Sequence, residues 1–254
     1  MEYMSVNESQ EVPRIGLGTW SLNGQKCYDT VRMAIDLGYR HIDTAEMYSN
    51  EREIGRAIKD SKVPRSAFFL TTKVWPDHLR ATDFENAVDN SLARLGTYYV
   101  DLLLIHWPNP SIALWETIQA MDKVREEGKT RNIGMSNFTA DQLSIADDLS
   151  SWPISFSQVP YSLESGAEEV HRTLALGTKV CAYSPLGRGK ALWSPKIKGV
   201  ADKHNKTPAQ VALKWLVQQE GVIAIPQSAD REHLKENLNV FDFTLDETDL
   251  EALK

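Results

Sequence analysis

The chain has 254 residues, of which 42% are hydrophobic and 25% are charged, and a chain of this length can bury the core of one large globular domain. Asp and Glu number 35 against 28 Lys and Arg, so the net charge is −7, and the lack of a basic stripe argues against nucleic acid as the main partner. The two cysteines lack metal-ligand spacing, and neither an apolar leader nor a run of 18 apolar residues is present. We therefore expect one domain over residues 1–254 in the cytoplasm, without a metal site or a membrane span.

Eight short apolar runs alternate with helical patterns along the chain. Their nearly continuous hydrophobic character is typical of parallel strands that are covered on both faces. The runs are RIGLGTW from Arg14, YRHIDT from Tyr39, AFFLTTKVW from Ala67, VDLLLIHWP from Val100, TRNIGMSN from Thr130, SFSQVPY from Ser155, KVCAYSPLG from Lys179 and GVIAIPQS from Gly221.

Amphipathic patterns with clear start and stop signals lie between these runs. In residues 50–60 the apolar positions recur at spacings of three and four, and residues 83–96 carry the same stripe and close with Gly96 as a helix C′ residue. Residues 207–221 begin with Thr-Pro, which predicts an N-cap followed by proline at the first helical position. Eight βα units in about 250 residues is the usual size of a (β/α)8 TIM barrel, so we predict this α/β fold, with a doubly wound open sheet as the alternative.

Two segments do not fit the repeat. The residues before Arg14 are expected to form a small hairpin or cap over the bottom of the barrel. The stretch from Gly187 to Asn205 is expected to lengthen the loop and helix region that follows the seventh strand.

Polar side chains end successive predicted strands. From Asp43 to Lys73 is 30 residues, from Lys73 to His106 is 33, and from His106 to Ser136 is 30, which is the length of one βα unit. Because the carboxyl ends of barrel strands meet at one rim, these side chains and Tyr48, which follows Asp43 by five residues, should converge where barrels carry their active sites. Taken alone, each residue has a structural explanation, such as a helix cap or rim packing. Together they predict a site, with Asp43 and Lys73 forming a buried ion pair.

Seven motifs, in order from about residue 12 to the C-terminus, resemble those of the aldo-keto reductases. This family resemblance implies a (β/α)8 barrel that reduces carbonyl compounds to alcohols with a nicotinamide cofactor. It also implies that Asp43, Tyr48, Lys73 and His106 are the four catalytic residues. The motifs are GLGTW, GYRHIDTAEMY, TTKVW, LLLIHWP, GMSNF, YSPLG and IPQS followed by LKENLNVFDFTL.

The chemistry of carbonyl reduction explains these residue types. Hydride that reaches the carbonyl carbon leaves negative charge on the oxygen, and a proton donor must meet that charge. A phenol such as Tyr48 is a weak acid near pH 7, and the ammonium of Lys73, held by Asp43, favours its phenolate and so assists proton transfer. His106 can donate a hydrogen bond that orients the carbonyl oxygen.

The cofactor site is not expected at a Rossmann turn, because GLG at residues 16–18 lacks the third glycine of that fingerprint. The resemblance instead implies that Ser136, Asn137 and Gln158 bind the nicotinamide carboxamide and that Tyr183 stacks on the ring. Ser184, Leu186 and Gly187 would lie beside the pyrophosphate, and further cofactor contacts are expected from Gly18, Thr19, Asp43, Ile225, Gln227, Ser228, His233 and Asn237.

The sequence departs from the family pattern where a 2′-phosphate would bind. The family has Lys before the Ser of IPKS and an Arg four residues before the Asn of EN, whereas this chain has Gln227 and His233 there. Both changes remove a full positive charge, because a histidine is fully charged only in acid. Arg231 and Lys235 lie nearby but out of register. We therefore expect the use of NADH as well as NADPH.

Only the side chains expected at the rim of the barrel suggest which substrates the protein selects. Trp20, Trp75 and Trp107, together with Tyr48 and His106, are expected to wall an apolar pocket. The segment after the Trp-Pro pair is short, and the chain ends with VFDFTLDETDLEALK, whereas many family members carry a longer C-terminal loop. Both features predict an open site for small aldehydes and ketones, in a protein that we expect to be a monomer.

Two alternative functions remain open at this stage. One is a catalytically weak regulatory subunit that binds a nicotinamide cofactor. The other is a barrel isomerase or aldolase that uses Lys73 as a Schiff base.

Overall fold

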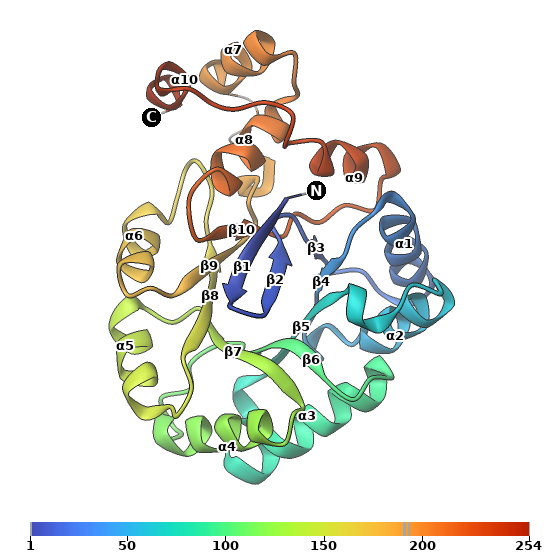
Figure 1. The fold of residues 1–254 in the computed structure, drawn as a ribbon, viewed down its shortest axis with the longest axis vertical. Helices are drawn as coiled ribbons and strands as arrows, with labels where there is room; N and C mark the ends of the chain where they lie inside the picture. Colours follow the sequence, from blue (N-terminus) through green and yellow to red (C-terminus); the bar gives the residue numbers. More distant parts are fainter. Residues whose placement is uncertain (1, 190–191, 193, 254) are drawn as a thin grey trace.

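The computed structural model describes residues 2–189, 192 and 194–253. Eight parallel strands form one sheet in the order β10-β9-β8-β7-β6-β5-β4-β3, with helices around it (Figure 1). The strands of this sheet are β3 (Leu17–Gly18), β4 (His41–Asp43), β5 (Phe69–Val74), β6 (Val100–Ile105), β7 (Thr130–Ser136), β8 (Ile154–Pro160), β9 (Lys179–Tyr183) and β10 (Val222–Ala224); β1 (Tyr3–Asn7) and β2 (Gln10–Pro13) form a separate hairpin.

The sheet closes on itself between its first and last strands. A parallel bridge joins Ile15 to Ala224, where the Gly16 N–H donates to the Ala224 carbonyl at 2.9 Å. Farther along, the Gly18 N–H donates to the Pro226 carbonyl at 3.1 Å. The predicted barrel is therefore confirmed, and the open-sheet alternative is wrong.

The predicted helix end at Gly96 and the predicted start at Thr207 are confirmed, whereas the helix after Thr207 ends at Val217, four residues before Gly221. Gly96 ends one helix with a φ of 65°, and the Thr207 hydroxyl and the Gln210 side chain cap the N-terminus of another reciprocally. The helices are α1 (Gly24–Leu37), α2 (Glu51–Asp60), α3 (Ala81–Leu95), α4 (Leu114–Glu126), α5 (Ala140–Leu149), α6 (Ala167–Ala175), α7 (Pro195–His204), α8 (Pro208–Val217), α9 (Arg231–Leu238) and α10 (Glu247–Ala252), and the 3-10 turns are η1 (Glu46–Tyr48), η2 (Arg65–Ala67), η3 (Pro76–His78) and η4 (Gly187–Gly189). The extra helix α7 confirms the expected insertion after the seventh barrel strand.

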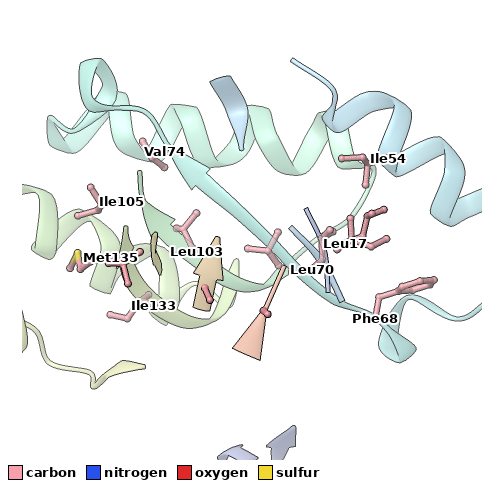
Figure 2. Packing of buried hydrophobic residues seen from close by; sticks show 14 of the residues in the cluster. Leu17, Ile54, Phe68, Leu70, Val74, Leu103, Ile105, Ile133 and Met135 are labelled. Carbon is pink, nitrogen blue, oxygen red and sulfur yellow. The ribbon is translucent and has the colours of Figure 1, made fainter. Parts of the chain in front are cut away.

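Alternation along each strand separates two apolar layers. On β6, Leu103 and Ile105 join the large cluster between strands and helices, part of which Figure 2 shows. Leu102 and Leu104, which alternate with them, belong to a second cluster that fills the inside of the barrel. Side chains at the same alternate positions as Leu102 and Leu104 therefore point toward the barrel axis.

The N-terminal hairpin closes one end of the barrel. Val12 is fully buried in the interior cluster, and the Gln10 side chain donates to Asp101 at the start of β6 at 3.1 Å. Figure 1 shows β1 and β2 lying across the centre of the ring. The predicted cap over the bottom is confirmed, which leaves the carboxyl ends of the strands open at the opposite face.

None of the helices in the described part of the chain is both long and apolar enough to cross a membrane.

Candidate active site

A cavity of about 690 Å³ opens at the carboxyl ends of the barrel strands. Most of the residues that the sequence placed in the site line it. Those residues are Gly18, Thr19, Trp20, Asp43, Tyr48, His106, Trp107, Ser136, Asn137, Gln158, Tyr183, Ser184, Leu186, Ile225 and Gln227.

The floor of the site is a buried ion pair. Lys73 is completely buried on β5, and its Nζ donates to Asp43 Oδ1 at 2.5 Å and to the Thr44 carbonyl at 2.7 Å. The second oxygen of Asp43 accepts from Gln158 Nε2 at 2.7 Å. Burial by itself lowers the pKa of Lys73, but the neighbouring Asp43 outweighs it and the pKa lies above its ordinary value. The predicted pair is confirmed, and Lys73 is an ammonium ion at neutral pH.

Tyr48 stands above this pair on the short turn η1. Ser49 ends the turn in the left-handed conformation, with a φ of 54°. The Lys73 Nζ lies 5.1 Å from the centre of the phenol ring. Burial raises the pKa of Tyr48, the charge of Lys73 lowers it, and Asp43 raises it again, so that the pKa ends above its ordinary value. Tyr48 therefore holds its proton at neutral pH.

His106 faces Tyr48 across the cavity. It follows β6, and its backbone N–H donates to the Val74 carbonyl at 3.0 Å. Its ring meets Tyr48 edge-on at 5.5 Å and Trp75 at 5.1 Å between centroids. Burial and the nearby Lys73 lower the pKa of His106 to about 3, so the imidazole is neutral at pH 7 and has one N–H to donate.

A polar chain runs along the carboxyl ends of β7 and β9. Asn137 donates to the His106 carbonyl at 2.9 Å and to the Ser136 hydroxyl at 3.0 Å, and its Oδ1 accepts from the Tyr183 hydroxyl at 2.9 Å. Asn137 has a φ of 63°, a left-handed conformation that asparagine adopts more readily than most residues. The amide and hydroxyl groups expected to hold a carboxamide are thus gathered on one wall.

A second cavity of about 360 Å³ adjoins the first, because Leu186 and Gln227 line both. Ser228, His233 and Asn237, which were predicted at the adenosine end, line it as well. The two cavities together run from Asp43 and Gln158 to His233 and Asn237. The donors and acceptors present along them fit a nicotinamide dinucleotide.

The side chains around the second cavity agree with the sequence, in which Gln227 and His233 replace the Lys and Arg of the family pattern. His233 is exposed, and its Nδ1 lies 4.0 Å from Asp230. Glu236, which the sequence analysis did not single out, adds a carboxylate to the lining. Neither Arg231 nor Lys235 is among the described residues that line the cavity.

Three predicted residues lie outside the two linings. Lys73 is completely buried and reaches the site through its ion pair with Asp43, and Trp75 packs edge-on against His106. Gly187 does not line either cavity, whereas Gly189 lines the first. The predicted residues Trp20 and Trp107 line the first cavity, together with Met47, a residue that sequence reasoning missed.

Asn50 was also missed, although it holds the loops of the site together. Its side chain is fully buried, accepts from the Thr44 hydroxyl at 2.6 Å, and donates to the Thr19 and Leu22 carbonyls at 3.0 and 2.9 Å. An asparagine directly before a helix suggests an N-cap, yet this side chain makes no cap hydrogen bond and binds the preceding loops instead.

Comparisons with known proteins agree with this geometry. The profile of the Aldo/keto reductase family matches residues 14–254. Methylglyoxal reductase DkgB of Salmonella typhimurium is 39% identical in an alignment 250 positions long that covers 95% of this chain and 92% of that relative. The solved structure of the thermostable aldo-keto reductase Tm1743 with the inhibitor epalrestat has a TM-score of 0.94 at 38% identity and covers 100% of this chain and 98% of that one. An aldo-keto reductase of the silkworm Bombyx mori, solved with NADPH, has a TM-score of 0.92 at 34% identity, over 99% of this chain and 86% of that one.

The family match and the structural similarity both extend over nearly the whole chain. Aldo-keto reductases are oxidoreductases that act on carbonyl and alcohol pairs, and they bind NADPH. This chain belongs to the aldo/keto reductase family.

Proposed function

We propose that the protein reduces small aldehydes and ketones to alcohols with NADPH or NADH. The observation that carries this proposal is the protonated Tyr48 above the buried Lys73–Asp43 pair, with His106 on the opposite side of the cavity. The reduced nicotinamide supplies the hydride when it is bound. The remaining work of the reaction falls to these four side chains.

Tyr48 supplies the proton. Its raised pKa keeps the proton in place until negative charge grows on the carbonyl oxygen. The ammonium of Lys73 then stabilises the phenolate that proton transfer leaves behind, and Asp43 keeps Lys73 charged in its buried position. In alcohol oxidation the same phenolate accepts the proton. Lys73 is a poor Schiff-base nucleophile here, because its nitrogen is protonated and already bound by Asp43 and Thr44.

His106 orients the substrate. Because its pKa is about 3, the ring donates a hydrogen bond as neutral imidazole and does not compete with Tyr48 as the acid. A fixed donor aimed at the carbonyl oxygen stabilises the developing charge without moving during the reaction.

The cofactor would lie along both cavities. We assign Ser136, Asn137 and Gln158 to the nicotinamide carboxamide and Tyr183 to its ring face. Ser184 and Leu186 would lie along the pyrophosphate, and Gln227, Ser228, His233 and Asn237 at the adenosine end. Since Gln227 and His233 stand where the family pattern has two permanently charged side chains for a 2′-phosphate, we propose that both NADPH and NADH are used.

The substrate would meet an apolar, exposed rim. Trp20 and Trp107 are 55% and 45% exposed, and Met47 lines the same cavity. This surface fits small carbonyl compounds with an apolar or compact body. The similarity to a methylglyoxal reductase supports testing 2-oxoaldehydes first among the candidates. We further propose that residues 1–254 form one domain that acts as a cytoplasmic monomer, without nucleic-acid or membrane partners.

A substrate panel tests this function. Oxidation of NADPH and of NADH would be followed by absorbance with aldehydes, 2-oxoaldehydes and sugars. We expect turnover with both cofactors, and highest for small aldehydes or 2-oxoaldehydes. Cofactor binding by fluorescence without turnover of any carbonyl would support the regulatory-subunit alternative instead, and substrate trapping by borohydride on Lys73 would support the Schiff-base enzyme.

A further inference from the structure

The orientation of the His106 ring depends on packing. Its Nδ1 is buried and has no hydrogen-bond partner among the described residues. The ring is therefore not fixed by the second hydrogen bond that usually sets the orientation of a histidine. What holds it is its position between the edges of Tyr48 and Trp75, at centroid distances of 5.5 and 5.1 Å.

Glu46 ties together the two segments that carry those aromatic side chains. It lies two residues before Tyr48 on η1, and its carboxylate accepts the backbone N–H of Trp75, directly after β5. The same carboxylate contacts His78 Nδ1 on η3 at 3.1 and 3.2 Å. The Glu46 side chain is 9% exposed and His78 is 51% exposed, so the bond to Trp75 is the more shielded contact.

These contacts form a closed circuit of four residues. Glu46 holds Trp75, Trp75 packs against His106, His106 packs against Tyr48, and η1 leads from Tyr48 back to Glu46. A carboxylate that binds a backbone N–H forms a charge-assisted hydrogen bond, which is stronger than a neutral one and therefore suits a fixed support.

We propose that Glu46 is a positioning residue that fixes the imidazole of His106 and the phenol of Tyr48 relative to one another. This role rests on the proposed carbonyl reduction. Without the anchor, the Trp75 backbone moves away from η1 and the His106 ring loses its supporting face. Its single N–H then no longer points at the position of the carbonyl oxygen. Cofactor binding does not change, because Glu46 and Trp75 line neither cavity.

The test compares three variants of Glu46 with a matched control. Glu46→Ala removes the acceptor, Glu46→Asp keeps the charge but shortens its reach, and Glu46→Gln keeps an oxygen at the right distance. Glu116→Ala is the control, because Glu116 also accepts a backbone N–H near the rim, from Ala81 at 3.1 Å, but lines neither cavity. Turnover, cofactor dissociation constants and unfolding temperatures would be measured for each protein.

Glu46→Ala and Glu46→Asp should lower kcat by about 10- to 100-fold, the scale of a small misplacement at a reacting centre. Their cofactor affinities should stay within about twofold, a free-energy change of under 1 kcal/mol. Glu46→Gln should recover most of the turnover, and Glu116→Ala should match the wild type. If Glu46 had a merely structural role, Glu46→Gln and Glu46→Asp would both lose stability and kcat, and glutamine would not restore turnover.

The possible outcomes distinguish a failure of the positioning role from a failure of the proposed function. If the wild type turns over carbonyls and Glu46→Asp, folded, does so at the wild-type rate, the positioning role is wrong while the proposed function stands. If the wild type turns over no carbonyl, the proposed function fails and the role of Glu46 fails with it. Should Glu46→Ala not fold, the comparison of Glu46→Asp with Glu46→Gln still decides the question.

Discussion

The proton of Tyr48 is governed by opposing effects at the scale of single residues. The sequence predicted that Lys73 would favour the phenolate, and the structure places its ammonium 5.1 Å from the ring centre. Burial raises the pKa of Tyr48 by more than Lys73 lowers it, which the sequence could not show. The acid is therefore stable in the resting site, and the cation contributes mainly when charge develops.

Replacing the phenol tests the proton donor directly. Tyr48→Phe should keep the fold and cofactor binding, since only the hydroxyl is removed. Carbonyl reduction should fall by roughly 100-fold or more, the usual contribution of a positioned general acid. Steady-state turnover with a small aldehyde, beside fluorescence titration of NADPH, measures both quantities. Near-normal turnover would show that another group protonates the alkoxide.

Replacing the cation tests how Tyr48 is tuned. Lys73→Met should cripple reduction and also leave Asp43 buried with Gln158 as its remaining side-chain donor. Removing one partner of a buried ion pair costs about 3–5 kcal/mol, so the midpoint of urea unfolding should fall clearly. Lys123→Met is the matched control, because Lys123 pairs with Glu85 at 2.6 Å on the surface and should change stability little. A fully active Lys73→Met protein would refute the tuning argument.

At the scale of elements, the sequence located all eight barrel strands but not their ends. The predicted run from Arg14 to Trp20 contains only two residues of regular strand, because Ile15 forms an isolated bridge across the barrel closure. The last strand is short as well, since Pro226 has no N–H to extend the ladder. The run LLLI on β6 gave no sign of which residues face inward, because both faces of a parallel strand are apolar.

The site residues that the sequence analysis found and those that it missed differ in where they lie in the fold. Asp43, Lys73 and His106 were found because the barrel brings strand ends to one rim at a regular sequence spacing. Glu46 and Asn50 lie in loops, and each acts by binding a backbone group of another loop. No spacing in the sequence encodes such contacts, because they depend on how the loops fold over the finished barrel.

We propose that the segment from β10 into α9 sets the choice between NADPH and NADH. Gln227→Lys with His233→Arg should strengthen NADPH binding and leave NADH nearly unchanged, since only NADPH carries the 2′-phosphate. Charged hydrogen bonds contribute about 1.5–3 kcal/mol against 0.5–1.5 for neutral ones, which allows a gain of about 10- to 100-fold. Lys235→Gln is the control, because Lys235 lies 3.9 Å from Glu232 and does not line the described cavity.

Fluorescence titration of both cofactors on the wild type, the double variant and the control measures this preference. The wild type should bind NADPH and NADH with affinities that differ far less than a thousandfold. Equal NADPH affinity in the wild type and the double variant would mean that the 2′-phosphate binds elsewhere.

For the whole molecule, two buried imidazoles, one inside the barrel and one at its rim, resist protonation. His41 on β4 is almost completely buried, its Nδ1 has no partner among the described residues, and Phe69 packs edge-on against it at 5.2 Å. Burial lowers its pKa to about 4, while Asp43 opposes and Lys73 adds to this shift. With His106, two buried histidines are neutral in the folded protein at pH values where an unfolded chain would protonate them.

This difference makes the fold sensitive to mild acid. Between the ordinary histidine pKa of about 6.5 and about 4, the unfolded chain binds more protons than the folded one, so stability falls as the pH falls. The stabilisation is fully present above about pH 6.5 and is lost by the time the folded pKa is reached. Each unit of pKa difference corresponds to about 1.4 kcal/mol, so His41 accounts for a few kcal/mol at most.

Urea unfolding at several pH values between 7.5 and 4.5 measures this loss. His41→Leu should flatten the pH dependence even if it lowers stability at pH 7.5, because the slope and not the absolute stability reports the proton uptake. His171→Gln, at an exposed position on α6, should leave the slope unchanged. His106 contributes in the same direction, so part of the slope should remain in His41→Leu. An identical slope in the wild type and His41→Leu would mean that the interior histidine does not couple folding to pH, and that acid acts on this barrel through other groups.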